Sequence, residues 1–291
     1  MRASTMLRKM MSEEGIIVAP GAYDGISARL IERAGFKAIY MTGAGTSASL
    51  LGNPDLGLTT QTEMANHAAN IAECVSVPVI ADADTGYGNP LNVVRTVRLY
   101  ERSGVAALHL EDQTFPKRCG HVSGKQVIPK EEFAQKIRAA AEYRTDPDLV
   151  IIARTDARAI NGFDDAIERA NYYHEAGADM IFVESPINVE EMALIPKLVK
   201  APVMMNLPTG GRTPMIPYPQ LQEMGYKLVI YPTTALYAAI FAIEQRLQIL
   251  KETGNDEYEQ KLELTNDIFE KMRMSWWLNV DKNFSREETP N

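Results

Sequence analysis

Short apolar runs alternate with amphipathic stretches along most of the chain. Each run has the length of a strand, is rich in β-branched or other apolar residues, and ends in Gly or polar residues. The predicted strands cover residues 16–24, 38–45, 77–86, 106–112, 149–156, 179–185, 201–210 and 227–234. The stretches between them have the periodicity of amphipathic helices, as in GISARLIERAG at 25–35, and several end at a Gly, which favours helix termination.

Eight strand–helix units without a break in composition favour one (β/α)8 barrel. A doubly wound open sheet normally has fewer strands and a Gly-rich phosphate loop near its first strand. Neither GxGxxG nor GxxxxGK[ST] occurs, and TGAG at 42–45 is explained equally well by a tight strand-to-helix turn. We therefore predict an α/β fold in which residues 1–291 form a single barrel domain with a C-terminal helical extension.

Two segments fall outside the repeating pattern. Residues 113–128 form a loop that could act as a mobile lid, because loops of more than about 12 residues in compact domains are often functional. Residues 256–280 predict a further helix carrying Trp276 and Trp277, which suggests packing against the barrel or a neighbouring subunit.

The composition is that of an ordinary globular protein, with 291 residues of which 45% are apolar and 23% charged. A formal net charge of −8 argues against nucleic acid or an anionic membrane as the main partner and favours a small substrate. No apolar run approaches the roughly 18 to 20 residues that span a bilayer. Because only Cys74 and Cys119 are present and the N-terminus does not resemble a signal peptide, we expect a cytoplasmic protein without disulfide bonds.

Polar residues stand at the carboxyl ends of the predicted strands. In a (β/α)8 barrel these ends converge on one face, where active sites are built. The residues there are Tyr23, Asp24, Thr42, Gly43, Asp82, Asp84, Glu111, Asp112, Arg154, Asp156, Glu184, Asn206 and Tyr231. This face therefore combines a ring of carboxylates with one guanidinium.

The acids of two neighbouring strands suggest a metal site. Asp82 and Asp84 are two residues apart, so both side chains point the same way on an extended strand, and Glu111 follows an equivalent position on the next strand. Oxygen ligands without a His or Cys cluster suit Mg²⁺ or Mn²⁺. Any one of these acids could instead cap the helix that follows it. As a group they predict metal binding, because clustered carboxylates without a cation are costly.

Arg154 and Asn206 are candidates for substrate binding. The Arg154 guanidinium presents paired donors that match a substrate carboxylate, or it forms an internal ion pair with Asp156 or Glu184, and the two roles are compatible. Asn206 could donate its amide to a substrate oxygen or occupy a turn before Pro208.

Cys119 lies in the predicted lid beside Lys117, Arg118 and His121. Neighbouring cations are expected to lower the pKa of its thiol and make it available for proton transfer. A nucleophilic role needs a paired base and an oxyanion hole, for which the sequence shows no second element, so a general acid is favoured. The alternative is a loop cysteine with basic neighbours by chance. His109 is expected to pack inside the barrel wall and not to take part in the site.

Four motifs resemble the isocitrate lyase and phosphoenolpyruvate mutase superfamily. They are ADADTGYG at 81–88, HLEDQ at 109–113, KRCGH at 117–121 and ARTDA at 153–157. The KRCGH pentapeptide is typical of the carbon–carbon lyase branch, whereas the mutases and decarboxylases generally lack its Cys. The resemblance implies a barrel enzyme that depends on Mg²⁺, or else on Mn²⁺. It also implies a homotetramer whose terminal helix, here residues 256–280, is exchanged between subunits.

The resemblance further implies residue roles around the metal and the reacting atoms. Asp82 would bind the metal directly. The residues that would act on it through water are Asp55, Asp84 and Glu111. Tyr40 would serve as base or orienting group for the substrate hydroxyl, and Cys119 would protonate the carbanion that bond cleavage releases.

The same resemblance places the substrate. The carboxylate of an α-keto acid would lie against the segment Thr42, Gly43 and Ala44, with Arg154 as its cationic partner. The remaining candidates for substrate binding are Gly120, His121, Glu184 and Asn206.

Retro-aldol cleavage of a 2-hydroxy acid fits these residues, because a metal stabilises the forming keto acid and a general acid under the lid protonates the other fragment.

From Asn206 the chain reads NLPTGGRTP, where 2-methylisocitrate lyases tend to read Asn-Ile-Thr-Glu-Phe-Gly. This smaller loop is more similar to the dimethylmalate lyase group. We therefore expect cleavage of a 2-alkylmalate, led by 2,3-dimethylmalate giving pyruvate and propionate, with 2-methylisocitrate giving pyruvate and succinate as the runner-up. Three rival classes are an oxaloacetate decarboxylase, a phosphonate-forming mutase and a non-enzymatic binding module.

Overall fold

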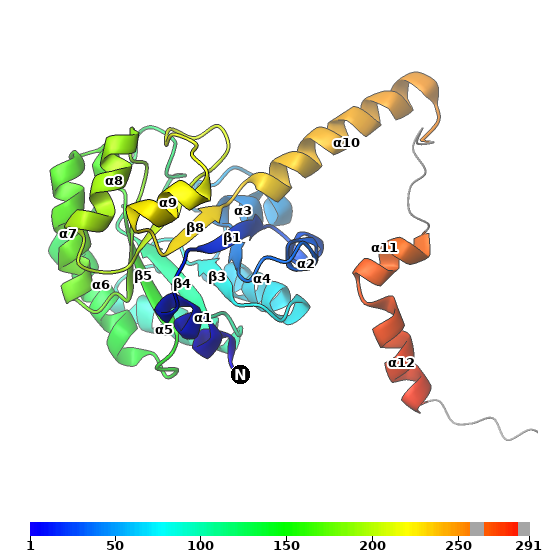
Figure 1. Ribbon diagram of the computed structural model, residues 1–291, viewed down its shortest axis with the longest axis horizontal. Helices are drawn as coiled ribbons and strands as arrows, with labels where there is room; N and C mark the ends of the chain where they lie inside the picture. The colour runs from blue at the N-terminus through cyan, green and yellow to red at the C-terminus, as the bar shows by residue number, and fades with distance from the viewer. Residues whose placement is uncertain (257–264, 285–291) are drawn as a thin grey trace, which may run out of the picture. The chain divides into compact units, whose positions relative to one another are not determined.

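Eight parallel strands close into a barrel in the computed structural model, which describes residues 1–256 and 265–284 (Figure 1). The strands are β1 Ile17–Ala22, β2 Ile39–Met41, β3 Val79–Asp82, β4 Ala107–Glu111, β5 Val150–Thr155, β6 Met180–Val183, β7 Val203–Asn206 and β8 Leu228–Tyr231. Each strand pairs with the next, and β8 pairs with β1 to complete the ring. The predicted (β/α)8 barrel is confirmed.

The observed strands are shorter than the predicted ones because the polar residues after each strand belong to loops or to the following helix. The clearest case is TGAG at 42–45, where Thr42 caps a helix that begins at Gly43. The helices that alternate with the strands are α1 Ala3–Ser12, α2 Gly25–Arg33, α3 Gly43–Leu51, α4 Gln61–Cys74, α5 Pro90–Arg102, α6 Lys130–Tyr143, α7 Phe163–Glu175, α8 Val189–Leu198, α9 Tyr218–Met224 and α10 Thr234–Thr253, with a 3₁₀ turn at Ala157–Ala159.

Apolar side chains fill two separate layers. One lies inside the barrel and includes Tyr40, Ile80 and Phe182, together with Leu7 of α1. The other lies between the strands and the surrounding helices and includes Tyr100, Phe133 and other fully buried side chains. Since the inside of the barrel is packed with side chains, a substrate can only be bound at one of its ends.

The described chain divides into two compact units, and the boundary lies inside α10. The barrel accounts for Met1–Ala238, and the second unit, from Ala239 onwards, contains the rest of α10 with α11 Thr265–Lys271 and α12 Met274–Phe284. The continuous helix predicted over residues 256–280 is wrong in its described part. The chain turns between α11 and α12 at Arg273, where φ is 66°, and residues 257–264 lie outside the described residues.

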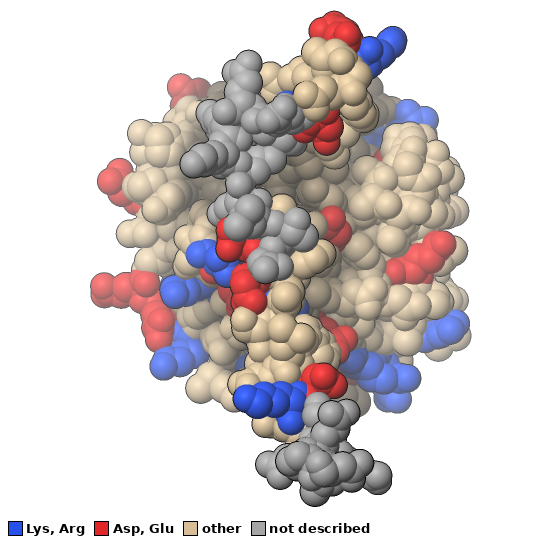
Figure 2. Space-filling model, turned by 90° about the vertical axis from the view of Figure 1, so that its right-hand side faces the viewer, with Lys and Arg blue, Asp and Glu red and all other residues tan. Residues whose placement is uncertain are grey.

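The surface carries charges of both signs. On the face that Figure 2 shows, acidic and basic side chains are scattered among uncharged ones. In the described parts of the chain, no helix combines the length and the apolar character needed to cross a membrane.

Candidate active site

The carboxyl ends of the strands bring together most of the predicted site residues. Parallel register places Asp82 of β3 beside His109 of β4, and Glu111 of β4 beside Arg154 of β5. The predicted site residues that are buried at this end are Tyr40, Thr42, Gly43, Asp82, Asp84, Glu111, Gly120, Arg154, Glu184 and Asn206. Burial of this many polar groups requires that they satisfy one another or a bound ligand.

Arg154 is surrounded by carboxylates. Its Nε and Nη2 donate to Asp156 at 2.9 and 3.1 Å, and its Nη1 lies 3.3 Å from Oε2 of Glu111. Nη2 also lies 3.5 Å from Oε2 of Glu184. The predicted internal ion pairs are therefore present, and they hold the guanidinium in one orientation.

Tyr40, Asp82 and His109 form a second buried cluster. The Tyr40 hydroxyl lies 2.8 Å from Nε2 of His109 and 3.4 Å from Oδ2 of Asp82. Nε2 of His109 is 3.5 Å from Oδ1 of Asp82. Burial lowers the pKa of His109 to about 4, outweighing the opposing effect of Asp82, so the imidazole is neutral at physiological pH.

His109 is in the barrel wall as expected, but its exclusion from the site does not match these contacts. The sequence carries a signal for it, because His109 and Glu111 are two residues apart on one strand and must face the same way. The same argument fails for Asp82 and Asp84, because β3 ends at Asp82 and Asp84 has a φ of 47°, so the two are not on one extended strand.

Asp55 and Asp84 converge on a cation supplied by the lid. Nζ of Lys117 lies 2.7 Å from Oδ1 of Asp55 and 2.6 Å from Oδ1 of Asp84. Burial raises the pKa of Asp84 to about 6, although Lys117 opposes the shift. These two acids thus face Lys117 in this structure.

The segment Thr42–Ala44 forms the N-terminus of α3. The Thr42 hydroxyl accepts a hydrogen bond from the Gly45 amide at 3.3 Å. A Cβ atom on Gly43 would lie 2.2 Å from Oδ2 of Asp82, so only glycine fits here. The first backbone amides of a helix and its positive end suit a carboxylate, which supports the predicted cradle for the keto acid.

The predicted lid is folded down over the site. Its two ends are joined, since the Thr114 amide donates to the Gln126 carbonyl and the Ile128 amide to the Asp112 carbonyl, both at 2.9 Å. A Cβ atom on Gly120 would lie only 2.5 Å from Nη2 of Arg154. The lid backbone therefore rests directly on the arginine.

His121 and Asn206 both contact Glu184. Nε2 of His121 lies 2.9 Å from Oε1 of Glu184, and Nδ2 of Asn206 donates to Oε2 at 3.1 Å. Nδ1 of His121 accepts from the Arg212 amide at 3.0 Å, which leaves the proton on Nε2. The loop after Asn206, which distinguishes this sequence from 2-methylisocitrate lyases, thus contacts the lid.

Cys119 is half-buried, and burial raises the pKa of its thiol. The expectation that basic neighbours lower this pKa is wrong. Lys117 binds Asp55 and Asp84, Nη1 of Arg118 donates to the Ser123 carbonyl at 3.0 Å, and His121 faces Glu184. Their charges are thus engaged by other groups, and the thiol keeps its proton at neutral pH.

Glu111 gives the clearest sign that a cation belongs in this site. Its side chain is fully buried, and neither carboxylate oxygen has a hydrogen-bond partner. Burial raises its pKa well above the usual range despite the nearby Arg154. A cation in the adjacent space would favour the ionised form.

The acids do not by themselves form a closed metal cage. Among the described residues, no three His, Cys, Asp or Glu side chains are close enough to hold a metal ion. The predicted arrangement needs only Asp82 as a direct ligand, with the other acids reaching the ion through water, as Mg²⁺ commonly requires. The donor set fits that ion, and its role stays a prediction.

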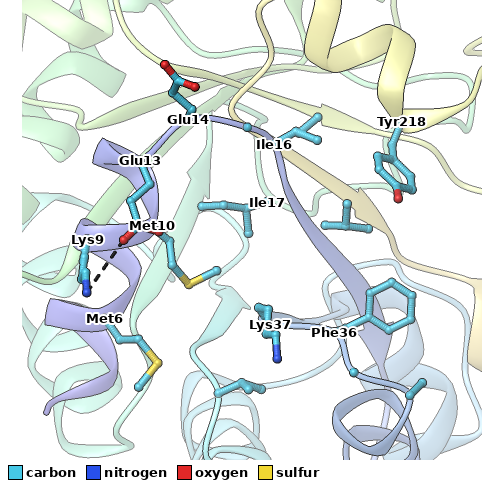
Figure 3. Close-up of a pocket in the computed structure, with 15 residues that line it drawn as sticks. Met6, Lys9, Met10, Glu13, Glu14, Ile16, Ile17, Phe36, Lys37 and Tyr218 are labelled. Atoms are coloured by element: carbon cyan, nitrogen blue, oxygen red, sulfur yellow. Dashed lines mark ion pairs between the residues drawn. The ribbon is translucent and has the colours of Figure 1, made fainter.

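A cavity of about 660 Å³ opens elsewhere, beside the start of β1. In Figure 3, Met6 and Met10 of α1 line one side of it, and Phe36 and Tyr218 line the other. Since Ile16 and Ile17 also line it, the cavity lies at the amino-terminal end of the barrel, opposite the predicted site. We assign it no part in catalysis.

Comparison with known proteins identifies the family. The sequence profile of phosphoenolpyruvate phosphomutase matches residues 7–251. The chain belongs to the phosphoenolpyruvate mutase/isocitrate lyase superfamily. It is 49% identical over 251 residues to the 2,3-dimethylmalate lyase of Eubacterium barkeri, which covers 86% of this chain and 87% of that protein.

Two further similarities agree with this assignment. The chain is 42% identical to the 2-methylisocitrate lyase of Halalkalibacterium halodurans, over 96% of this chain and 92% of that protein. A crystal structure of 2,3-dimethylmalate lyase superimposes with a TM-score of 0.93 at 40% identity, covering 97% of this chain and 95% of that one. The predicted superfamily and barrel are confirmed, and these relatives are lyases, the enzyme class predicted for this chain.

Proposed function

We propose that this protein is a Mg²⁺-dependent carbon–carbon lyase that cleaves a 2-alkylmalate, led by 2,3-dimethylmalate giving pyruvate and propionate. The observation that carries the proposal is the closed lid, which places the Cys119 segment beside the buried Arg154 and Glu184. The 49% identity to a 2,3-dimethylmalate lyase supports the choice of substrate. 2-Methylisocitrate, giving pyruvate and succinate, is the second candidate, because a 2-methylisocitrate lyase is 42% identical.

The carboxylate next to the hydroxyl-bearing carbon would be held at the N-terminus of α3. There the backbone at Gly43 and Ala44 offers hydrogen-bond donors, and Arg154 supplies the opposing positive charge. Because Arg154 is fixed by Asp156, little orientational freedom is lost when the substrate binds. Glu184, Asn206 and the lid would contact the other end of the substrate.

Magnesium, or manganese, would be held directly by Asp82. Asp55, Asp84 and Glu111 would act on it through water, and the lack of hydrogen-bond partners at both Glu111 oxygens supports this position. Bound there, the ion would stabilise negative charge on the keto acid being formed.

The first proton leaves the substrate hydroxyl. The Tyr40 hydroxyl reaches both Asp82 and the neutral His109, so it can orient the substrate hydroxyl, and His109 can receive a proton through it. As the C2–O bond becomes a carbonyl, the C2–C3 bond breaks and its electron pair remains on C3.

Cys119 is the proposed proton donor to C3. Its raised pKa keeps the thiol protonated, which a general acid requires. Transfer of that proton to C3 completes propionate, and the proton taken from the hydroxyl regenerates the thiol. The closed lid keeps water away from the carbanion until this step is complete.

We also propose a cytoplasmic homotetramer. Apolar side chains exposed on α10 and α12 support assembly, because exposed patches of this kind mark interfaces. They are Ile240, Phe241, Ile243, Leu247, Trp276, Trp277 and Leu278. Cys74 and Cys119 are both free, as a reducing compartment would keep them.

One assay separates the candidate activities. The purified protein is incubated with Mg²⁺ and either 2,3-dimethylmalate, other 2-alkylmalates, 2-methylisocitrate, isocitrate or oxaloacetate, while pyruvate, glyoxylate, oxalate and CO₂ are followed. Pyruvate from 2-alkylmalates supports the proposal, and a separate incubation with a phosphonate should show no turnover. CO₂ from oxaloacetate alone indicates a decarboxylase.

Cys119→Ser tests the proton donor, because a serine hydroxyl is a much weaker acid than a thiol. We expect turnover to fall by about 10²- to 10⁴-fold while substrate and Mg²⁺ still bind. Cys74→Ser is the matched control, since Cys74 ends α4, and it should keep full activity. Full turnover by Cys119→Ser would contradict the assignment.

A further inference from the structure

Lys125 is a buried cation at the far end of the lid, and none of the sequence motifs assigns it a role. Its Nζ donates to the Gly120 carbonyl and, at 2.6 Å, to Oδ1 of Asp156. The Lys125 side chain is 2% exposed and that of Asp156 is fully buried. A lysine is rarely buried to this degree without a specific partner. We propose that Lys125 is the latch that holds the lid closed, a positioning residue for Cys119.

The lid end of the latch is next to the proposed proton donor. The Gly120 carbonyl that binds Lys125 also accepts from Oγ of Ser185 at 3.2 Å. Gly120 directly follows Cys119 and leaves no room for a Cβ atom against Arg154. Fixing this carbonyl therefore fixes the backbone from which the thiol projects.

The barrel end of the latch is rigid before the lid arrives. Asp156 accepts two hydrogen bonds from Arg154, and its own amide donates to Oδ1 of Asp112 at 2.9 Å. Oδ2 of Asp112 is held in turn by Thr155 and Tyr173, at 2.8 and 2.9 Å. Lys125 thus binds a carboxylate that is already fixed in position, so little conformational entropy is lost at Asp156 when the lid closes.

The other cations of the lid do not offer the same test. Lys117 binds Asp55 and Asp84, which are proposed to act on the metal, so changing Lys117 would perturb metal binding as well. Arg118 bonds within the lid, to the Ser123 carbonyl. The bonds described for Lys125 involve none of the proposed metal residues, so its removal leaves the contacts of those residues in place.

Breaking the latch should open the lid. A buried, charge-assisted bond is lost in Lys125→Met, and the Asp156 carboxylate keeps only its bonds from Arg154. We expect the population of the open lid to rise by roughly 10- to 100-fold. Since the role of Lys125 in turnover rests on the proposed function, kcat should fall with the closed fraction of the lid, by at most that factor, with a much smaller change in KM and an unchanged affinity for Mg²⁺.

Lid opening is measured without turnover, through the rate at which iodoacetamide modifies Cys119. All proteins carry Cys74→Ser so that one thiol is followed, and rates are taken with and without Mg²⁺ plus oxalate, a small dicarboxylate that resembles a planar keto acid. Lys125→Met and Lys125→Gln should both react faster than the parent, and Lys125→Arg, which keeps the charge, should react at an intermediate rate. Lys130→Met is the matched control, because Lys130 pairs with the exposed Glu168 outside the lid.

The outcomes distinguish the latch from the proposed activity. Equal modification rates for the parent, Lys125→Met and Lys125→Gln in both conditions overturn the latch. Faster modification together with an unchanged kcat also overturns it as a positioning device for Cys119. If the parent cleaves none of the candidate substrates but the modification rates differ as expected, the proposed function fails and the latch remains.

Discussion

Replacing Gly43 by alanine tests whether the N-terminus of α3 and Asp82 form one site. The added Cβ would lie 2.2 Å from Oδ2 of Asp82 and 2.8 Å from its Cγ. Ordinary contacts begin at 3.4 Å, so one of the two groups must move by about 3.4 − 2.2 = 1.2 Å. Both are buried, and the carboxylate also accepts the Asp84 amide at 2.9 Å. Neither the Asp82 carboxylate nor the backbone at residue 43 can move without displacing a group proposed to bind the metal or the substrate.

A misplacement of about 1 Å in a catalytic site can cost roughly 100-fold in rate. We therefore expect Gly43→Ala to lower kcat/KM for pyruvate formation by about 100-fold, and to weaken Mg²⁺ binding measured by calorimetry. Gly52→Ala is the control at the other end of the same helix. Its Cβ would meet nothing within 4 Å, but φ there is 61°, so it should lose stability and keep activity. Activity of Gly43→Ala within threefold of the parent would refute this reading of the site.

Three further variants or conditions address separate groups. The raised pKa of Cys119 predicts that kcat falls on the alkaline side, above the ordinary thiol value of 9.0. The residual turnover of Cys119→Ser should lack this alkaline fall in a pH–rate profile. Burial lowers the pKa of His67 below 6.5, so the unfolded chain binds more protons than the folded one. The free energy of unfolding should therefore fall as the pH drops below 6.5. In urea titrations this fall should be smaller for His67→Gln. Asp82→Asn should lower Mg²⁺ affinity in calorimetry by more than the 10- to 100-fold typical of changes outside the ligand set, whereas unchanged affinity would exclude Asp82 as the direct ligand.

The barrel could be predicted because its signal is local and repeated eight times. Strands that are buried on both faces give apolar runs, and helices that are buried on one face give amphipathic stretches. Their strict alternation is compatible with only a few fold topologies. Arg154, Glu111 and Asp82 could be placed together for the same reason, since parallel strands bring their carboxyl ends to one face. The same reasoning extends to His109, which shares its strand face with Glu111.

The contacts of the lid could not be derived from spacing. Lys117, Arg118 and His121 are neighbours of Cys119 in the sequence, but Lys117 and His121 bind carboxylates of the barrel and Arg118 binds a carbonyl of the lid itself. Which charges surround the thiol therefore depends on the path of the loop over the barrel. The same holds for Lys125, whose partner Asp156 is 31 positions away. The break at Arg273 was also missed, because neither a Gly nor a Pro marks it.

The charges of the lid and of the carboxyl end of the barrel are complementary, which favours closure of the whole lid. The carboxylates gathered at this end of the barrel are those of Asp55, Asp82, Asp84, Glu111, Asp156 and Glu184. The barrel itself contributes Arg154 as a cation, and the lid adds Lys117 and Lys125. With the lid open, excess negative charge would favour binding of a divalent cation and oppose a second anion. Metal should therefore bind before the dicarboxylate substrate, and closure of the lid, which brings in the two lysines, should follow substrate binding. Because Cys119 lies between the two lid lysines in the sequence, its proton reaches the site only when the lid has closed.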